Sequence, residues 1–133
     1  MRQRFRTFKT LRVTLASGEA AVTGRRAHIS TDDGLCYADP GEHTDLLPAG
    51  RFMETFTGDG QRTTVIDLFE EIVAHAWQND SPPNNVQATD LFGEVFLLDG
   101  TTVSTSDEGG TRSSGGRAIL IEGGLVYVRA PRL

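Results

Sequence analysis

GEVFLLDGTTVSTS, residues 93–106, is the stretch of sequence that decides the fold. Two β-prone runs flank Asp99-Gly100, a dipeptide typical of two-residue type I′ hairpin turns. Before this turn, Val95 and Leu97 alternate with neighbours that face the other way, as in a strand with one buried side. The stretch therefore predicts a β-hairpin.

A second hairpin follows in the same pattern. Residues 117–122 and 125–129 flank Gly123-Gly124, and a loop rich in Gly and Ser, residues 107–116, separates the two hairpins. We expect the following side chains to supply the packing of the second hairpin: Ile119, Ile121, Leu125, Val126, Tyr127 and Val128. Four strands with short connections form a meander, and meanders close into barrels or sandwiches. The sequence thus predicts an all-β fold, a small single-domain barrel or sandwich.

The first half of the chain carries shorter strand signals. Strands are expected at residues 11–15, 21–22, 26–30, 35–38 and 51–57, where β-prone residues alternate between groups of turn-forming residues. Residues 39–49 are predicted to be a loop, and residues 58–61 (GDGQ) a hairpin loop.

Residues 64–80, TVIDLFEEIVAHAWQND, fit two structures. The apolar spacing from Val65 to Ala76 is that of an amphipathic helix, which predicts one short helix within residues 64–78. Alternation through Ile66 and Leu68 also fits a strand, provided that a β-bulge at Glu70-Glu71 restores the register. Both structures stay open on periodicity alone.

Bulk composition excludes several classes of protein. The length of 133 residues suits one domain with a real core, and the hydrophobic fraction of 38% argues against general disorder. Because Cys36 is the single cysteine, no disulfide can form within the chain, and we expect this residue to be buried and apolar in character. No apolar run approaches the length of a membrane span and no signal peptide is indicated, so we expect a protein made in the cytoplasm.

Charge is distributed unevenly along the chain, whose net charge is −5. The first twelve residues contain five basic residues and no acidic ones, which leaves eight basic against 18 acidic residues in the remainder. We therefore divide the chain into a basic arm, residues 1–10, and a single β domain, residues 11–133. A basic arm on an acidic body indicates docking on a partner, with a frayed and solvated terminus as the alternative.

No constellation of residues predicts catalysis, a cofactor or a metal. The histidines, His28, His43 and His75, lie in different segments without ligand spacing, and they are interpreted as surface or interface residues. Adjacent carboxylates such as Glu70-Glu71 are poor acid–base partners because neighbours on a strand face opposite ways. Glycine pairs such as Gly115-Gly116 lack the rest of a phosphate-binding loop and are interpreted as loop glycines.

Several motifs nevertheless recur in an order that points to a family. In chain order they are AGRFMET at 49–55, the long segment 65–77, ATDLFG at 88–93, VFLLDGTTV at 95–103 and TRSSGGR at 111–117, followed by the terminal hairpin. In this order and spacing, residues 47–133 resemble the small head decoration proteins of tailed bacteriophages, also called capsid cement proteins. Residues 1–46, including the basic arm, fall outside the resemblance.

The resemblance implies a non-enzymatic, all-β structural protein of the virion. Such a protein binds the outer surface of the capsid after assembly in the host cytoplasm, and it stabilises contacts between subunits of the major capsid protein. It also implies a long strand at 65–77 and a homotrimer or a monomer, with no cofactor. From the residues themselves we expect no membrane contact, and the acidic body argues against direct nucleic-acid contact, which stays open only for the arm with Phe5 and Phe8. The alternatives are another virion module, such as a head–tail connector or a tail β-protein, and an enzyme or ligand-binding β-barrel.

Two groups of residues are predicted to contact the capsid. The first is the arm with the start of the β domain, where basic and aromatic residues interleave: Arg2, Arg4, Phe5, Arg6, Phe8, Lys9 and Arg12. The second is the loop between the hairpins, where Arg112 and Arg117 are expected to anchor a neighbour.

Overall fold

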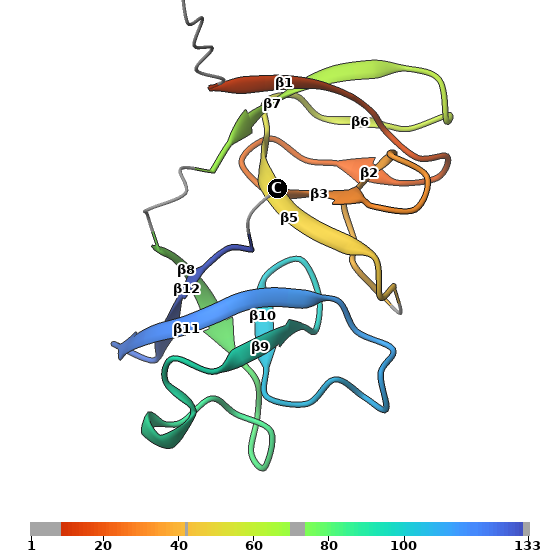
Figure 1. Cartoon of the computed structure of the whole chain (residues 1–133). Helices are drawn as coiled ribbons and strands as arrows, with labels where there is room; N and C mark the ends of the chain where they lie inside the picture. The colour runs from red at the N-terminus through yellow and green to blue at the C-terminus, as the bar shows by residue number, and fades with distance from the viewer. Residues whose placement is uncertain (1–8, 42, 70–73, 132–133) are drawn as a thin grey trace, which may run out of the picture.

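A computed structural model describes residues 9–41, 43–69 and 74–131, which form twelve strands and one short 3-10 helix. The strands are β1 (Thr10–Thr14), β2 (Ala20–Ala21), β3 (Arg26–Ser30), β4 (Cys36–Tyr37), β5 (Leu46–Phe52), β6 (Phe56–Thr57), β7 (Thr63–Leu68), β8 (Ala74–Asn79), β9 (Glu94–Leu97), β10 (Thr102–Ser104), β11 (Ser114–Glu122) and β12 (Leu125–Arg129), and the helix is η1 (Ala88–Asp90). The predicted all-β fold is therefore confirmed. Figure 1 shows that the strands gather in two groups, one from each half of the chain.

The first group, here called the N-terminal sheet, has the strand order β1-β7-β5-β3-β4 and is antiparallel throughout. A parallel bridge between Leu15 and Cys36 brings its two edges together, and the Ala16 N–H donates to the Cys36 carbonyl at 2.9 Å. Strands β2 and β6 form a separate two-stranded ribbon. The core of this half consists of Val13, Leu15, Ala21, Ala27, Cys36, Ala49, Phe52 and Ile66.

The second group is a closed barrel with the strand order β10-β8-β12-β11-β9. Its ladders are antiparallel except between β10 and β8, which run parallel. The predicted alternation in β9 is confirmed, since Val95 and Leu97 are fully buried whereas Glu94 and Phe96 are not. The core of the barrel consists of Trp77, Val86, Val95, Leu97, Val103, Ala118, Val126 and Val128.

The two predicted hairpins both exist, but only one has the predicted turn. Gly123 and Gly124 have φ angles of 60° and 77°, as a two-residue type I′ turn requires. The prediction for Asp99-Gly100 was wrong, because β9 ends at Leu97 and β10 begins at Thr102. The intervening loop is longer because the Asp99 carboxylate accepts hydrogen bonds from backbone N–H groups two and three residues ahead.

The strands of the barrel do not follow a simple meander. Strand β9 lies between β10 and β11 and pairs with both, so the chain crosses from β10 to β11 past β9. The loop that makes this crossing is shorter than predicted, because β11 begins at Ser114 and includes Gly115 and Gly116. Packing requires glycine at position 116, because a side chain there would collide with the Arg129 carbonyl of β12.

Two boundaries in the first half were also predicted wrongly. The loop expected at residues 39–49 ends early, because β5 occupies Leu46–Phe52 and the strand expected at 51–57 is divided between β5 and β6. Residues 58–61 do not close a hairpin, because β6 pairs with β2 whereas β7 pairs with β1 and β5.

Within the segment 64–80, residues 64–68 and 74–79 are strand. Strand β7 belongs to the N-terminal sheet and β8 to the barrel, so the single long strand implied by the family resemblance was wrong. The alternative helix finds no support in the described part of residues 64–78, and the proposed bulge at Glu70-Glu71 lies outside the described residues.

Contacts between β5 and β11, together with hydrogen bonds, join the two halves. The Ser113 hydroxyl donates to the His43 carbonyl at 2.6 Å and accepts from the Leu46 N–H at 3.0 Å. The single domain at residues 11–133 stays a prediction, to which the structure adds that this region contains two hydrophobic cores.

Candidate functional site

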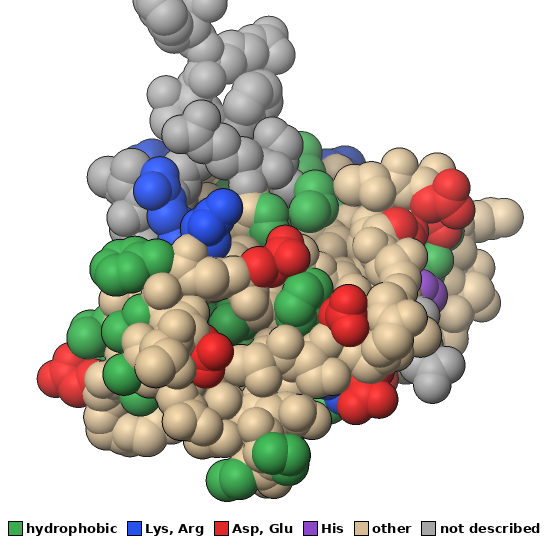
Figure 2. All heavy atoms as spheres, turned by 60° about the horizontal axis from the view of Figure 1, so that its bottom comes forward, with side chains coloured by type: hydrophobic (Ala, Val, Ile, Leu, Met, Phe, Trp, Pro, Cys, Tyr) green, Lys and Arg blue, Asp and Glu red, His purple; other side chains and the backbone are tan. Residues whose placement is uncertain are grey.

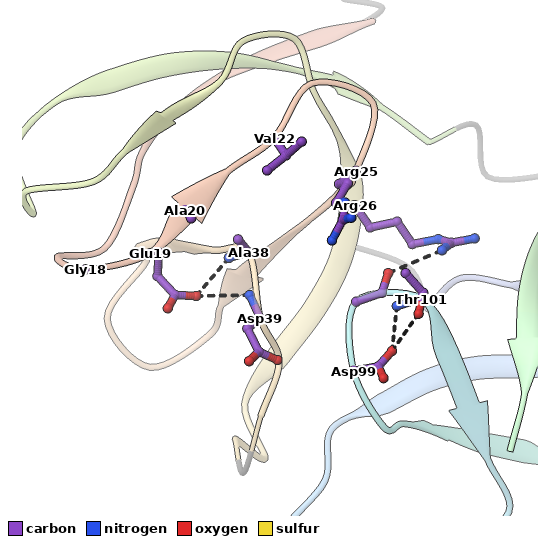
Figure 3. Close-up of a pocket in the computed structure, with 11 residues that line it drawn as sticks. Gly18, Glu19, Ala20, Val22, Arg25, Arg26, Ala38, Asp39, Asp99 and Thr101 are labelled. Carbon is purple, nitrogen blue, oxygen red and sulfur yellow. Dashed lines mark hydrogen bonds between the residues drawn. The ribbon is translucent and has the colours of Figure 1, made fainter. Parts of the chain in front are cut away.

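A cleft of about 550 Å³ lies where the N-terminal sheet meets the barrel (Figure 3). One wall comes from the segment around β2 and the residues after β4, and the other from the β9–β10 loop. Its lining residues are Gly18, Glu19, Ala20, Val22, Arg25, Arg26, Ala38, Asp39, Asp99, Gly100 and Thr101. The cleft thus combines three carboxylates and two guanidinium groups from segments far apart in sequence.

The carboxylates of the cleft are tied to backbone groups. One oxygen of Glu19 accepts from the N–H groups of Ala38 and Asp39, at 2.9 and 3.0 Å, as Figure 3 shows. Burial raises the pKa of the Asp99 carboxyl, but hydrogen bonds from Thr101 and its neighbour outweigh this effect and hold the pKa below its ordinary value. These hydrogen bonds hold the loops that form the walls of the cleft. Glu19 and Asp99 therefore have a structural role.

Arg26 joins the two halves at the floor of this region. Its guanidinium lies 3.7 Å from the centre of the Trp77 ring of the barrel and donates to the carbonyls of Gly100 and Ala76. Burial, together with the nearby charge of Arg51, lowers the pKa of Arg26 to about 10, which leaves it charged at neutral pH. Arg26 is therefore a fixed link between β3 and the barrel.

Two side chains of reactive types, a thiol and an imidazole, are buried in the N-terminal half. Cys36 is fully buried, which confirms the prediction for this residue, and burial raises the pKa of its thiol to about 12. His28 is also fully buried, so its interpretation as a surface or interface residue was wrong. Its ring is enclosed because β3 lies between β4 and β5, and its Nδ1 donates to the Tyr37 carbonyl at 3.1 Å. Neither group reaches the cleft lining.

Among residues 9–41, 43–69 and 74–131, no three His, Cys, Asp or Glu side chains converge so as to hold a metal ion. Within the same ranges no helix has the length and hydropathy to cross a membrane.

Of the predicted arm contacts, only the last two are described. Arg2, Arg4, Phe5, Arg6 and Phe8 lie outside the described residues. Lys9 is exposed and its carbonyl accepts from the Leu68 N–H at 2.9 Å, while Arg12 is exposed on β1 and donates to the Thr63 hydroxyl at 3.2 Å. The arm therefore enters the fold at β1, an outer strand of the N-terminal sheet.

The predicted loop contacts lie in the other half, on the barrel. The Arg112 side chain is only 12% exposed, because it donates to the Ser106 carbonyl at 2.9 Å and pairs with Glu108 at 3.5 Å. Arg117 is exposed and donates to the Phe92 carbonyl at 2.8 Å. The two groups of predicted residues are thus on separate parts of the molecule, and Arg112 holds its own loop together.

Exposed apolar side chains on the barrel were missed by the sequence analysis. Ile119 and Leu125 were expected to pack inside, yet each is 36% exposed, and Leu120 between them is 45% exposed. The signal was present: residues 118–121 are four consecutive apolar residues, and a strand cannot direct all of them to one core.

Comparison with known proteins yields no match to a family model, to a curated protein or to a solved structure.

Proposed function

We propose that this chain is a non-enzymatic structural protein of a tailed-phage virion, a decoration protein that binds the outer capsid surface and stabilises contacts between major capsid subunits. The observation that carries the proposal is the order of the family-like motifs. Three of them, at 88–93, 95–103 and 111–117, form consecutive parts of one object: η1, the β9–β10 hairpin and the start of β11. These three family-like motifs therefore lie in the C-terminal barrel and the segment that leads into it.

Charge supplies a second argument. A basic arm enters at β1, while the rest of the chain is acidic. Arg is favoured over Lys in this arm, and its planar guanidinium suits paired contacts with carboxylates. Many copies that each bridge neighbouring subunits resist internal pressure through multivalency, without any one tight site.

The direct test is binding to capsids of the phage that encodes the chain, prepared without this protein. Purified protein should bind to saturation in co-sedimentation, at a stoichiometry fixed by capsid symmetry, and bind isolated capsid subunits weakly. Absence of saturable binding to mature capsids would refute the proposal.

Removal of residues 1–8 tests the role of the arm, because it spares Thr10 of β1 and the Lys9 carbonyl that accepts from the Leu68 N–H. The truncated protein should keep its circular dichroism spectrum and bind capsids more weakly, and its remaining binding should depend less on salt because fewer charge contacts are left. The substitution Arg62→Glu, an exposed charge change beside the opposite end of β1, is the control. Unchanged occupancy after the truncation would exclude the arm as the contact.

The alternative within the virion is a head–tail connector or a tail β-module. Such proteins work as closed rings, so light scattering of the purified chain separates the two proposals. A ring of fixed large size favours the connector, whereas a monomer or trimer favours decoration.

A further inference from the structure

The outer face of the barrel over β11 and β12 carries an ordered pattern of side chains. Val126 and Val128 are buried, so the alternate residues of β12, among them Leu125 and Tyr127, project outward. On β11, Leu120 is paired with Tyr127 and therefore shares this outward face.

A β-bulge adds one more apolar side chain to this face. The register of β11 against β12 shifts between Ala118 and Leu120, so Ile119 has no partner of its own. Ala118 is fully buried, while Ile119 and Leu120 are 36% and 45% exposed although they are consecutive. Bulges redirect side chains in this way and are features rather than defects of a sheet. The result is an apolar row formed by Ile119, Leu120 and Leu125.

Opposite charges bound this apolar row along β11. Arg117 lies at one end, and Glu122 lies at the other, next to the turn. Both are exposed, and the ion pairs formed among the residues that the structure describes involve neither of them. The face therefore has a basic end, an apolar middle and an acidic end. Figure 2 shows hydrophobic side chains at the surface beside acidic ones.

We propose that this face binds the same face of a second copy of the chain, around a two-fold axis between Ile119 and Leu120. In that arrangement β11 lies antiparallel to β11 of the second copy, so Ile119 contacts Leu120 of the other copy. Arg117 then lies over Glu122 of the second copy, and the reverse pair forms by symmetry, because both residues are equally distant in sequence from the axis. Strand β11 thus carries both the basic and the acidic residue that pair with those of the second copy.

The size of the patch sets the strength of this contact. The three apolar side chains expose on the order of 200 Å², against about 800 Å² per partner in a standard interface. We therefore expect weak association in solution, with a dissociation constant on the order of 100 μM. Copies held close together on a larger surface would occupy the contact at far lower bulk concentration.

Sedimentation equilibrium of the purified full chain, at concentrations up to about 1 mM, tests the proposal. The wild type should show a monomer–dimer equilibrium. Arg117→Glu and Glu122→Arg should each raise the dissociation constant about tenfold, because each replaces two attractive pairs by two repulsive ones. The double variant should return to the wild-type value.

Mixing the two single variants gives the sharpest result. In the mixed pair, the two acidic positions of one variant face the two basic positions of the other, so the mixture should associate more tightly than either variant alone. Leu120→Ser should weaken the dimer, whereas Met53→Ser, a matched change at a 55% exposed site on the N-terminal half, should not. Circular dichroism of every variant verifies the fold.

Three outcomes would overturn the proposal: a monomeric wild type at all concentrations, an equal effect of Leu120→Ser and Met53→Ser, or a mixture that associates no better than its components. The inference does not rest on the proposed capsid function. Because no capsid is present in this experiment, a failure to dimerise would refute only the proposed dimer and would not affect the test of capsid binding.

Discussion

The buried His28 should make the stability of this protein fall sharply in mild acid. Its ring is fully enclosed, with Nδ1 donating to the Tyr37 carbonyl, so the proton of the neutral ring lies on Nδ1. Its Nε2 is buried without a hydrogen-bond partner among the described atoms. A second proton would place an unpaired charge in the core. The pKa of His28 is therefore lowered to about 4, mainly by burial. The charge of Arg26 also lowers it, whereas the Tyr37 carbonyl and Asp39 raise it.

The sign and size of the effect follow from proton linkage. An unfolded histidine binds its proton below about pH 6.5, whereas the folded His28 binds it only below about pH 4. The free energy of unfolding is therefore undiminished by His28 above pH 6.5, and it falls as the pH drops from 6.5 to 4 because the unfolded chain then binds a proton that the folded protein does not. The full loss is about 3 kcal/mol, and about 2 kcal/mol of it is already gone at pH 5. This is a large share of the ~5–15 kcal/mol typical of a domain.

Urea unfolding at pH 7.5 and pH 5, followed by circular dichroism, measures this loss. The comparison protein is His28→Gln, which keeps an N–H donor but cannot titrate; His28→Phe serves as a second variant if the first is too unstable. The wild type should lose about 2 kcal/mol more than the variant between the two pH values, since all other titrating groups are common to both. An equal loss in the two proteins would refute the assignment of a depressed pKa to His28.

Three further predictions concern other buried groups. Arg26→Ala should lower the free energy of unfolding by about 2 kcal/mol in urea titrations, because it removes the hydrogen bonds and the ring contact with Trp77, and Arg26→Lys should recover only part of the loss. Gly50→Ala should cost about 3 kcal/mol or more, because its methyl group would collide with the Asp67 carbonyl; a loss under about 1 kcal/mol by thermal unfolding would contradict this contact. Cys36, whose burial raises the thiol pKa to about 12, should resist a chromogenic disulfide reagent in native protein and react at once in urea, and fast native labelling would show that the core opens locally.

Strand pattern and glycine chemistry made the barrel the more predictable half. Alternation identified the two faces of β9, and Gly123-Gly124 identified the turn between β11 and β12 because two positive φ values suit few other residues. The turn predicted at Asp99-Gly100 was wrong because the Asp99 carboxylate accepts hydrogen bonds from backbone N–H groups, and this arrangement competes with the type I′ geometry. Which of the two wins depends on the hydrogen bonds formed by the loop, and these are not visible in the dipeptide.

The N-terminal half was harder because its pairings are distant in sequence. Strand β5 contains Pro48, which lacks an N–H and argues against an internal strand. It is tolerated there because the ladder with β3 is irregular beside it, between Ala27 and His28. Such an irregularity is a property of two strands together, so no single-strand pattern could reveal it.

The predicted contact residues illustrate the same limit. Charge alone identified Arg112 and Arg117 equally, yet the pairing of Arg112 with Glu108 and the Ser106 carbonyl directs it back into its loop. The apolar row on β11 was missed because hydrophobic residues were assigned to the core by type. Its position follows from the bulge beside Ala118, which is a feature of the register with β12.

Synthesis of the chain from its N-terminus treats the two halves differently. The N-terminal sheet needs no strand beyond β7, so all of its partners have been made once Leu68 has emerged. Strand β8 comes next, but it pairs with β10 and β12, and Trp77 lies opposite Val126 in the final strand. About 50 residues must be added in between, which takes roughly 3–10 s at cellular rates of translation. During that interval Trp77, which is buried in the finished barrel, lacks the strand that covers it.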